Sequence, residues 1–315
     1  MQPSMNALPQ LCVAPLQYWW PREQVQSLYE DLADSAVDTV VLGEVVCSRR
    51  HEWKLADWLA LGRALRSAGK QVLLATPTLV MGEADLRDIR AIVQQQEFAL
   101  EAGDASVLGL LLQAGARSFS LGPHLNIYNR QALREHVALG ATRWCAPAEL
   151  PLATVASIGW GDASDEQPMP LVEAWAFGRL PLAFSARCFT ARHYGLNKDH
   201  CAFRCLEHAD GLAVRSGDGS DFLCLNGTQV QSAGVHALLE PPQRLRQAGI
   251  GSLRLAPCSR GFAQVVSLFD ALRREALDAQ QAQQALRELD LPGDLIDGFA
   301  HARPGMQAVA ARALP

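Results

Sequence analysis

The chain has 315 residues, of which 49% are hydrophobic and 19% are charged, so it holds enough apolar material for one large barrel or two modest domains. A formal net charge of -5 at pH 7 gives no basic footprint for nucleic acid and disfavours a nucleic-acid substrate. No stretch approaches the roughly twenty apolar residues of a membrane span, and no signal peptide precedes the first apolar run. We therefore expect a soluble, cytoplasmic protein in which disulfides are rare.

Short apolar runs alternate with helix-period segments along most of the chain. Residues 25–36 and 55–65 repeat apolar side chains at the spacing of a helix that packs on one face. Five apolar runs each end two residues before a proline, which has no N–H to donate to a sheet. These prolines are Pro15, Pro77, Pro123, Pro147 and Pro257. The repeated strand, loop and helix predict an α/β fold, a (β/α) barrel of TIM-barrel type that is either complete or distorted.

We predict one barrel domain over residues 1–315. Its rhythm breaks at a cysteine-rich loop insertion, residues 185–210, which is followed by a hairpin around the Gly217-Asp218-Gly219 turn. Ala, Gln, Leu and Arg predominate from about residue 277, which predicts terminal helices over 277–315 with an interruption at Pro292 and Gly293.

The eight cysteines fall into two groups by their neighbours. Four lie in or beside apolar runs, which predicts small buried core residues; they are Cys12, Cys145, Cys224 and Cys258. The other four are surrounded by cations, which favour the metal-binding thiolate; they are Cys47, Cys188, Cys201 and Cys205. Because parallel strands of a barrel all end on one face, Cys47 can meet the three cysteines of the loop.

Spacing alone leaves the metal open. A structural zinc site and a four-iron cluster are close to even, with dispersed ligands leaning towards iron–sulfur. A third reading makes Cys47 a nucleophile activated by His51, but it leaves the other three cysteines unexplained. The nearby Arg49, Arg187 and Arg192 serve either as charge compensation or as a site for a dicarboxylate.

Several polar residues follow predicted strands at the opening face, where barrel enzymes carry their polar groups. Glu44, His124 and Asn226 are the catalytic candidates, with Asn126 and Tyr128 as further pocket residues. A structural histidine beside Pro123 explains His124 equally well.

Five stretches in chain order resemble the UbiV family, a branch of the collagenase-like peptidase family that acts in oxygen-independent ubiquinone biosynthesis. They read LGEVVCSRR, GPHLNIYN, RWCAPAEL, LPLAFSARCFTARHYGLNKDHCAFRC and LNGTQVQSAG. The resemblance runs from about residue 8 to about residue 275. The acidic segment 161–167 and the stretch after 277 lie outside it, and no residue pattern supports a peptidase activity.

The resemblance implies a 4Fe–4S cluster held by Cys47, Cys188, Cys201 and Cys205. It implies the iron–sulfur subunit of an oxygen-independent hydroxylase that acts on the aromatic ring of a prenylated ubiquinone precursor. The implied partners are a UbiU-like homologue in a heterodimer and a UbiT-like lipid-binding accessory protein, with prephenate as oxygen donor. Two alternatives stay open: a non-catalytic electron-transfer or stabilising subunit, and an RNA-base hydroxylase, which the acidic charge disfavours.

Overall fold

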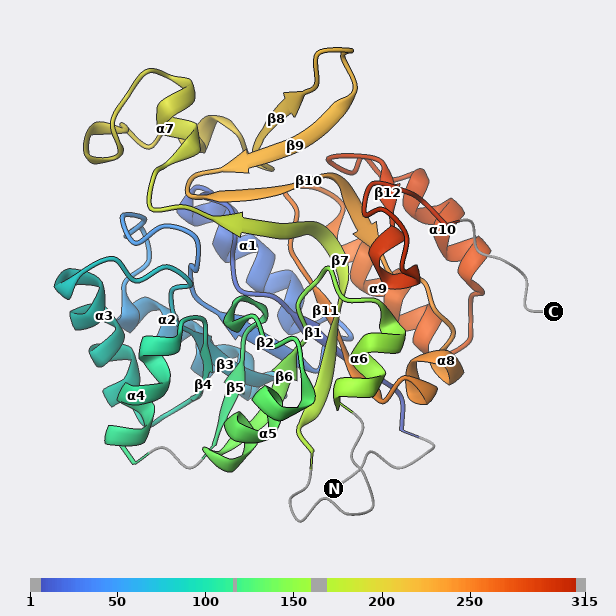
Figure 1. Cartoon of the computed structure of the whole chain (residues 1–315), viewed down its shortest axis with the longest axis horizontal. Coiled ribbons are helices and arrows are strands. Elements are labelled where there is room, and N and C mark those ends of the chain that lie inside the picture. Colours follow the sequence, from blue (N-terminus) through green and yellow to red (C-terminus); the bar gives the residue numbers. More distant parts are fainter. Residues whose placement is uncertain (1–6, 116–117, 160–168, 310–315) are drawn as a thin grey trace.

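A computed structural model describes residues 7–115, 118–159 and 169–309. Eight parallel strands form a closed barrel in which β11 pairs with both β1 and β7 (Figure 1). The strands are β1 (Gln10–Val13), β2 (Thr39–Leu42), β3 (Gln71–Ala75), β4 (Ala99–Ala102), β5 (Phe119–Leu121), β6 (Ala141–Cys145), β7 (Leu171–Phe184) and β11 (Ile250–Leu255). The predicted TIM-barrel-like fold is confirmed, in its closed form. The acidic segment 161–167 lies outside the described residues.

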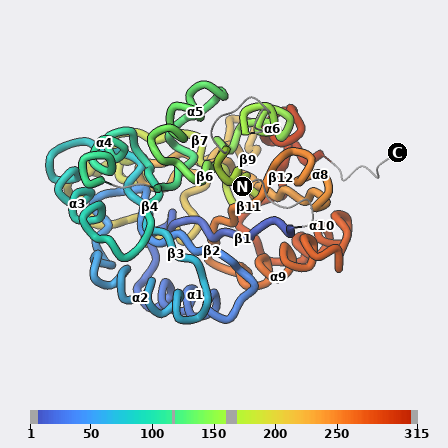
Figure 2. Tube along the Cα trace, turned by 90° about the horizontal axis from the view of Figure 1, so that it is seen from below, coloured from blue at the N-terminus to red at the C-terminus, as the bar shows by residue number. Residues whose placement is uncertain are grey.

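Helices between successive strands cover the outside of the barrel, as Figure 2 shows for α1 to α4. The covering helices are α1 (Arg22–Ala33), α2 (Leu55–Ser67), α3 (Glu83–Gln94), α4 (Ala105–Gln113), α5 (Arg130–Ala138), α6 (Leu152–Gly159), α8 (Pro242–Gln247) and α9 (Phe262–Arg273). Their apolar faces and the outward side chains of the strands share one core, which includes Tyr29 of α1 and Leu42 of β2. No helix of the described residues is both long and apolar enough to cross a membrane.

The prolines that end the apolar runs stand where the sequence predicts them. Strands β1, β3, β5, β6 and β11 each stop two residues before their proline. The chain therefore leaves every one of these strands at the same place relative to the barrel, because proline cannot extend the ladder of hydrogen bonds. The loops that follow line the carboxyl-terminal mouth.

Strand β7 makes two kinds of pairing within one continuous sheet. Its first half pairs in parallel with β6 and β11, and its second half pairs antiparallel with β10 (Gln229–Ala237). Strand β10 continues to β9 (Asp221–Asn226) and β8 (Leu212–Arg215), so that an antiparallel extension rises from the barrel mouth (Figure 1). Strands β8 and β9 form the hairpin predicted around the Gly-Asp-Gly turn.

The C-terminal region is not purely helical as predicted. Helix α10 (Ala279–Arg287) is followed by a two-residue strand, β12 (Leu295–Ile296), and a 3-10 turn at Gly298–His301. The helix cannot continue through Pro292, and the apolar Leu295–Ile296 pair joins the open edge of β10 in parallel. Residues 310–315 of the predicted terminal helices lie outside the described residues.

The barrel interior holds a buried network of four charges. Arg254 donates from Nε to Glu173 Oε1 at 2.5 Å and from Nη1 to Glu101 Oε1 at 3.1 Å. Arg143 Nη1 reaches Glu173 Oε2 at 2.8 Å, where the Ser252 hydroxyl also donates at 2.7 Å. Burial by itself raises the pKa of Glu173, but Arg254 and Arg143 outweigh it and lower that pKa to about 2. Two cations and two anions therefore balance inside the barrel.

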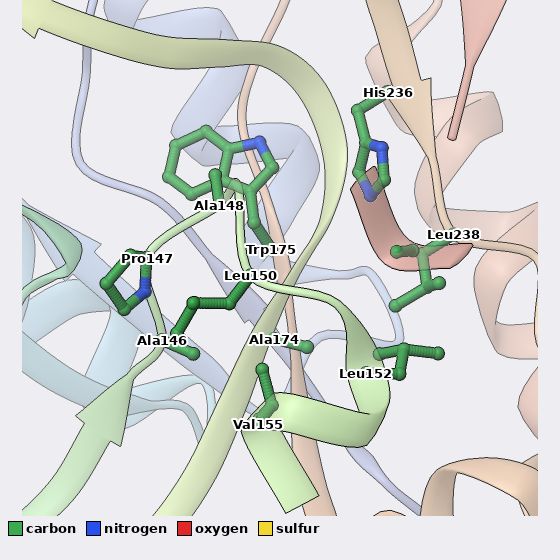
Figure 3. A pocket seen from close by; sticks show the side chains of 11 residues that line it. Ala146, Pro147, Ala148, Leu150, Leu152, Val155, Ala174, Trp175, His236 and Leu238 are labelled. Carbon is green, nitrogen blue, oxygen red and sulfur yellow. The ribbon is translucent and has the colours of Figure 1, made fainter. Parts of the chain in front are cut away.

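A small cavity lies where α6 and β7 meet β10 (Figure 3). Its volume is about 20 Å³ and its lining is apolar apart from His236 and the Trp175 indole. His236 Nδ1 and Trp175 Nε1 are buried without a hydrogen-bond partner in the part of the chain that is described. Burial is the main cause that lowers the pKa of His236, to about 4. The space suits one water molecule, not a substrate.

Candidate functional site

The four core cysteines predicted from their apolar neighbours are buried, as expected. Burial is the main cause that raises the pKa of each thiol, so these sulfurs stay protonated and unreactive. They are Cys12, Cys145, Cys224 and Cys258. The remaining four cysteines are partly exposed and lie where the extension meets the barrel mouth. We call these four cysteines, together with Arg50, the cysteine face.

Cys47 stands in the loop after β2, and neighbouring segments hold that loop. The carbonyl of Val45 accepts from the hydroxyl of Thr78 at 2.8 Å, and the carbonyl of Val46 accepts from the hydroxyl of Thr228 at 2.5 Å. Thr228 lies in the turn between β9 and β10. The loop that carries Cys47 is thus tied to the antiparallel extension that carries the other three cysteines.

Cys188 caps α7 (Phe189–His193), where its Sγ accepts from the amide of Ala191 at 3.4 Å. The amide of Phe189 donates to the carbonyl of Gly227 at 2.7 Å, which fixes α7 against the β9–β10 turn. Cys201 ends a 3-10 turn at Lys198–His200, and Cys205 lies within a second one at Arg204–Glu207. Three short turns therefore present the three cysteines of residues 185–210.

The thiols of Cys188 and Cys205 are each influenced by other cysteines of this face. Burial contributes most to the raised pKa of Cys188, and Cys47 and Cys201 raise it further. Burial is also the largest cause that raises the pKa of Cys205; Arg50 opposes it, while Cys47 and Cys188 add to it. The fold thus brings Cys47 close to cysteines far along the chain. Among the described residues, no group of three or more His, Cys, Asp or Glu side chains forms a site for a metal ion. The predicted metal centre stays a prediction.

Arg50 is the buried cation of the cysteine face. Its Nη1 donates to the carbonyl of Gln17 at 2.7 Å and its Nη2 donates to Asn226 Oδ1 at 2.9 Å. Asn226 is fixed in turn, because its Nδ2 donates to the same Gln17 carbonyl at 2.8 Å. Arg50 Nε is buried and has no acceptor within the ranges that the structure describes. Asn226, a catalytic candidate from the sequence, is therefore buried and orients Arg50 rather than lining a cavity.

The other cations around the cysteines differ in their pairing. Arg49 Nη1 lies 2.8 Å from Asp199 Oδ1, a pair that joins the Cys47 loop to the cysteine-bearing turns. Arg187 and Arg192 are exposed, and neither forms an ion pair with a described residue. Of the three arginines that the sequence analysis names, Arg187 and Arg192 are thus the ones free to meet an external anion.

Two cavities at the mouth divide the polar candidates. The mouth cavity, of about 330 Å³, lies between the exits of β5 and β6 and the second half of β7, and it is lined by His124, Asn126 and Tyr128. Burial and, to a smaller extent, Arg254 lower the pKa of His124 to about 4, so this imidazole is neutral at pH 7. Burial and the hydrogen bond to Glu149 raise the pKa of Tyr128 to about 12.

Glu44 lines a different cavity, which we call the tryptophan pocket. It has a volume of about 280 Å³ and lies between the exits of β2 and β3 and the helices α2 and α3. Trp53 and Trp58 form one wall, with ring centroids 5.0 Å apart, and Cys47 also lines the pocket. Burial raises the pKa of Glu44 to about 8, although Arg50 opposes it. The sequence analysis missed both tryptophans, and their spacing of five residues beside Glu44 gave no distinctive signal.

The sequence pattern of Peptidase family U32 matches residues 23–307. Among solved structures, the U32 peptidase Mk0906 is similar at 10% identity, with 80% of this chain and 94% of that one covered and a TM-score of 0.44. Dihydropteroate synthase (FolP) from Thermus thermophilus is similar at 12% identity, with coverage of 85% and 96% and a TM-score of 0.39. The spore cortex-lytic enzyme SleL of Bacillus megaterium matches at 10% identity, with coverage of 86% and 75% and a TM-score of 0.42.

Proposed function

The chain belongs to peptidase family U32, and on this premise we propose that it is the iron–sulfur subunit of an oxygen-independent hydroxylase. Its substrate in this proposal is the aromatic ring of a prenylated ubiquinone precursor. What supports the proposal is that Cys47, from the loop after β2, lies near enough to Cys188 and Cys205 to raise the pKa of both thiols, and that Cys201 also raises the pKa of Cys188.

The chemistry of these residues fits a 4Fe–4S cluster held by the four cysteines. Cysteine thiolates are the usual ligands of such clusters, and Cys47 raises the pKa of both Cys188 and Cys205. Four thiolates at one place need compensating positive charge. Arg50 supplies it from a fixed position, and its buried Nε still lacks an acceptor among the described atoms. When bound, the cluster supplies one-electron transfer.

The residues around the cysteines suit the oxygen donor that the proposal requires. Prephenate carries two carboxylates, and an arginine guanidinium pairs with a carboxylate in a bidentate geometry. Arg187 and Arg192 are exposed beside Cys188 and have no acidic partner among the described residues. We assign them to the binding of this anion, whereas the paired Arg49 holds the two cysteine-bearing segments together.

The proposed partner is a UbiU-like homologue in a heterodimer, with a UbiT-like protein that delivers the lipid substrate. Large apolar side chains are exposed on and near the antiparallel extension, which supports a protein contact on this side. They are Leu182, Leu196, Leu206 and Phe222.

Metal analysis of the protein purified without oxygen tests the proposal. We expect about four irons and four sulfides per chain and a broad visible absorption. Changing any one of the four cluster cysteines to serine should remove most of the iron. The matched control is Cys258→Ser, a buried thiol outside the cysteine face, which should keep it. Stoichiometric zinc, or full iron content in Cys47→Ser, would overturn the proposal.

A second candidate function is a non-catalytic electron-transfer or stabilising subunit. It is favoured by the separation of the catalytic candidates, because His124 and Glu44 line different cavities and Asn226 is buried. The variants Glu44→Gln and His124→Gln, assayed in the complex with a UbiU-like partner, distinguish the two. Unchanged turnover with an intact cluster supports the non-catalytic subunit, and a loss of turnover supports a catalytic share for this chain.

A further inference from the structure

The tryptophan pocket combines features that the cysteine face does not use. Its wall is made by the indole rings of Trp53 and Trp58, and its lining includes Leu55 and Ile92 from the helices α2 and α3. A cavity of about 280 Å³ approaches the lower end of the range typical of small-molecule sites. Flat apolar walls of this kind favour an aromatic ring, because stacked and edge-on ring contacts add to the burial of apolar surface.

Three polar atoms of residues that line this pocket are buried without a partner in the described structure: Oε2 of Glu44, Nε1 of Trp53 and Nε of Arg50. Arg50 belongs to the cysteine face, which leaves the atoms of Glu44 and Trp53 for a ligand of the pocket. Leaving such groups unpaired costs about 1–3 kcal/mol each, so a ligand that pairs with both gains affinity from them. The indole is a donor only, whereas a carboxyl group accepts when ionised and also donates when protonated. A hydroxyl group on the ligand is both donor and acceptor, so it is complementary to the indole N–H and to the carboxyl group.

The charged residues that line the pocket are of both signs. Asp85 and Asp88 of α3 and the carboxyl group of Glu44 line it together with Arg50 and Lys54. Burial raises the pKa of Glu44 to about 8, with Glu52 adding to the effect and Arg50 opposing it, so the neutral acid predominates at pH 7. The protonated carboxyl group of Glu44 offers a hydrogen-bond donor to a neutral ligand.

We infer that the tryptophan pocket binds the neutral phenolic ring of the substrate, with the Glu44 carboxyl group and the Trp53 indole paired to its hydroxyl. The inference deepens the proposed function, on which the choice of a phenol rests. Because Cys47 lines the same pocket, a ring bound there lies beside one of the four cysteines. The mouth cavity, which is more polar, is then left for other groups.

Binding of a simple phenol to the full chain tests this inference. We choose 4-propylphenol as the probe and propylbenzene, which lacks the hydroxyl group, as its matched comparison, with affinities from ligand-observed NMR titration. Propylbenzene should bind at least about tenfold more weakly, because it leaves both polar atoms unpaired. Equal affinity for the two probes, or no binding of 4-propylphenol, would overturn the inference.

Variants at Glu44 sharpen the same test. Glu44→Gln keeps a donor of similar shape and should change the affinity for 4-propylphenol by less than about threefold, whereas Glu44→Leu should weaken it by about tenfold. Glu23→Gln is the matched control, since Glu23 is exposed on α1 and does not line the pocket. Trp53→Phe, which keeps a ring and loses the N–H, should weaken binding as well. Unchanged binding in both Glu44→Leu and Trp53→Phe would contradict the assignment.

The same samples separate this inference from the proposed function. Iron and sulfide are measured on each preparation before the titration. Binding of 4-propylphenol to a chain that carries no iron would support the pocket and overturn the cluster. A full iron content without 4-propylphenol binding would support the cluster and overturn the pocket.

Discussion

The barrel interior and the cysteine face both contain several ionisable side chains, but only the interior pairs each charge with one of the opposite sign. Inside the barrel, Arg143 and Arg254 meet Glu101 and Glu173, so that every charge has a partner of the opposite sign. On the cysteine face, Cys47 and Cys188 both raise the pKa of the Cys205 thiol, and Arg50 Nε has no acceptor among the described residues. Polar groups that a fold pairs internally serve its stability. Groups that it leaves unpaired point to an external ligand.

The largest effect should come from breaking the balance inside the barrel. Arg254→Met leaves Glu101 and Glu173 buried with one cation fewer, and we expect the free energy of unfolding to fall by about 3–5 kcal/mol. Chemical denaturation of the purified chain measures it. The control is Arg260→Met, which breaks an exposed ion pair with Asp290 and should cost less than about 1 kcal/mol. A similar loss of unfolding free energy in both variants would show that the interior network contributes no more to stability than an exposed ion pair.

The second effect concerns a buried histidine near the small cavity of Figure 3. The pKa of His236 is about 4 in the folded chain and near 6.5 when unfolded, so the unfolded state binds the extra proton first as the pH falls. Stability should therefore decline between pH 6.5 and pH 4, by up to about 3 kcal/mol from this group. Denaturation curves of His236→Gln should show a shallower decline than those of the native chain. The exposed His193→Gln should leave the decline unchanged, and an equal slope in His236→Gln would contradict the prediction.

A smaller effect should follow from the residue that orients Arg50. Asn226→Leu removes the acceptor of Arg50 Nη2, and we expect a loss of about 1–3 kcal/mol in unfolding free energy. Under the proposed function it should also lower the iron content, because Arg50 is then less well placed beside Cys205. Iron analysis and denaturation of the same sample check both parts. Full iron content despite the expected loss of stability would show that the orientation of Arg50 does not matter for the cluster.

The smallest effect should come from the ion pair between the two cysteine-bearing segments. Arg49 is half exposed and Asp199 is largely exposed, with side-chain exposures of 36% and 80%, so Arg49→Gln should cost about 0–1 kcal/mol. Its effect should diminish as salt is added, since salt screens exposed charges. A loss as large as that of Arg254→Met would mean that the cysteine face is held as rigidly as the barrel interior.

The sequence predicted the barrel well because its signals are local. Proline after an apolar run marks a strand end wherever it occurs, and the spacing of apolar residues marks a helix. The hairpin of β8 and β9 was predicted from its turn residues for the same reason. The short strand β12 was missed because two apolar residues carry no periodicity and depend on the free edge of β10.

The site was predicted less completely because its groups depend on long-range packing. Glu173 and Arg254 each stand alone in an apolar strand, and only closure of the barrel shows that they face one another. The separation of Glu44 from His124 into two cavities also follows from helix packing, not from their shared place after strands. That Cys47 lies near cysteines of the segment 185–210 could be foreseen, because strand ends of a barrel share one face. A metal centre formed by all four cysteines stays a prediction.

The fourteen-residue strand β7 also limits how this architecture can be divided. Its first half pairs in parallel with barrel strands and its second half pairs antiparallel with β10, so the antiparallel part cannot be removed as a module without cutting this strand. A fragment that kept only the antiparallel part with Cys188, Cys201 and Cys205 would lack both Cys47 and the first half of strand β7. A variant of this chain that lost the antiparallel extension would also have to rebuild one strand of the barrel.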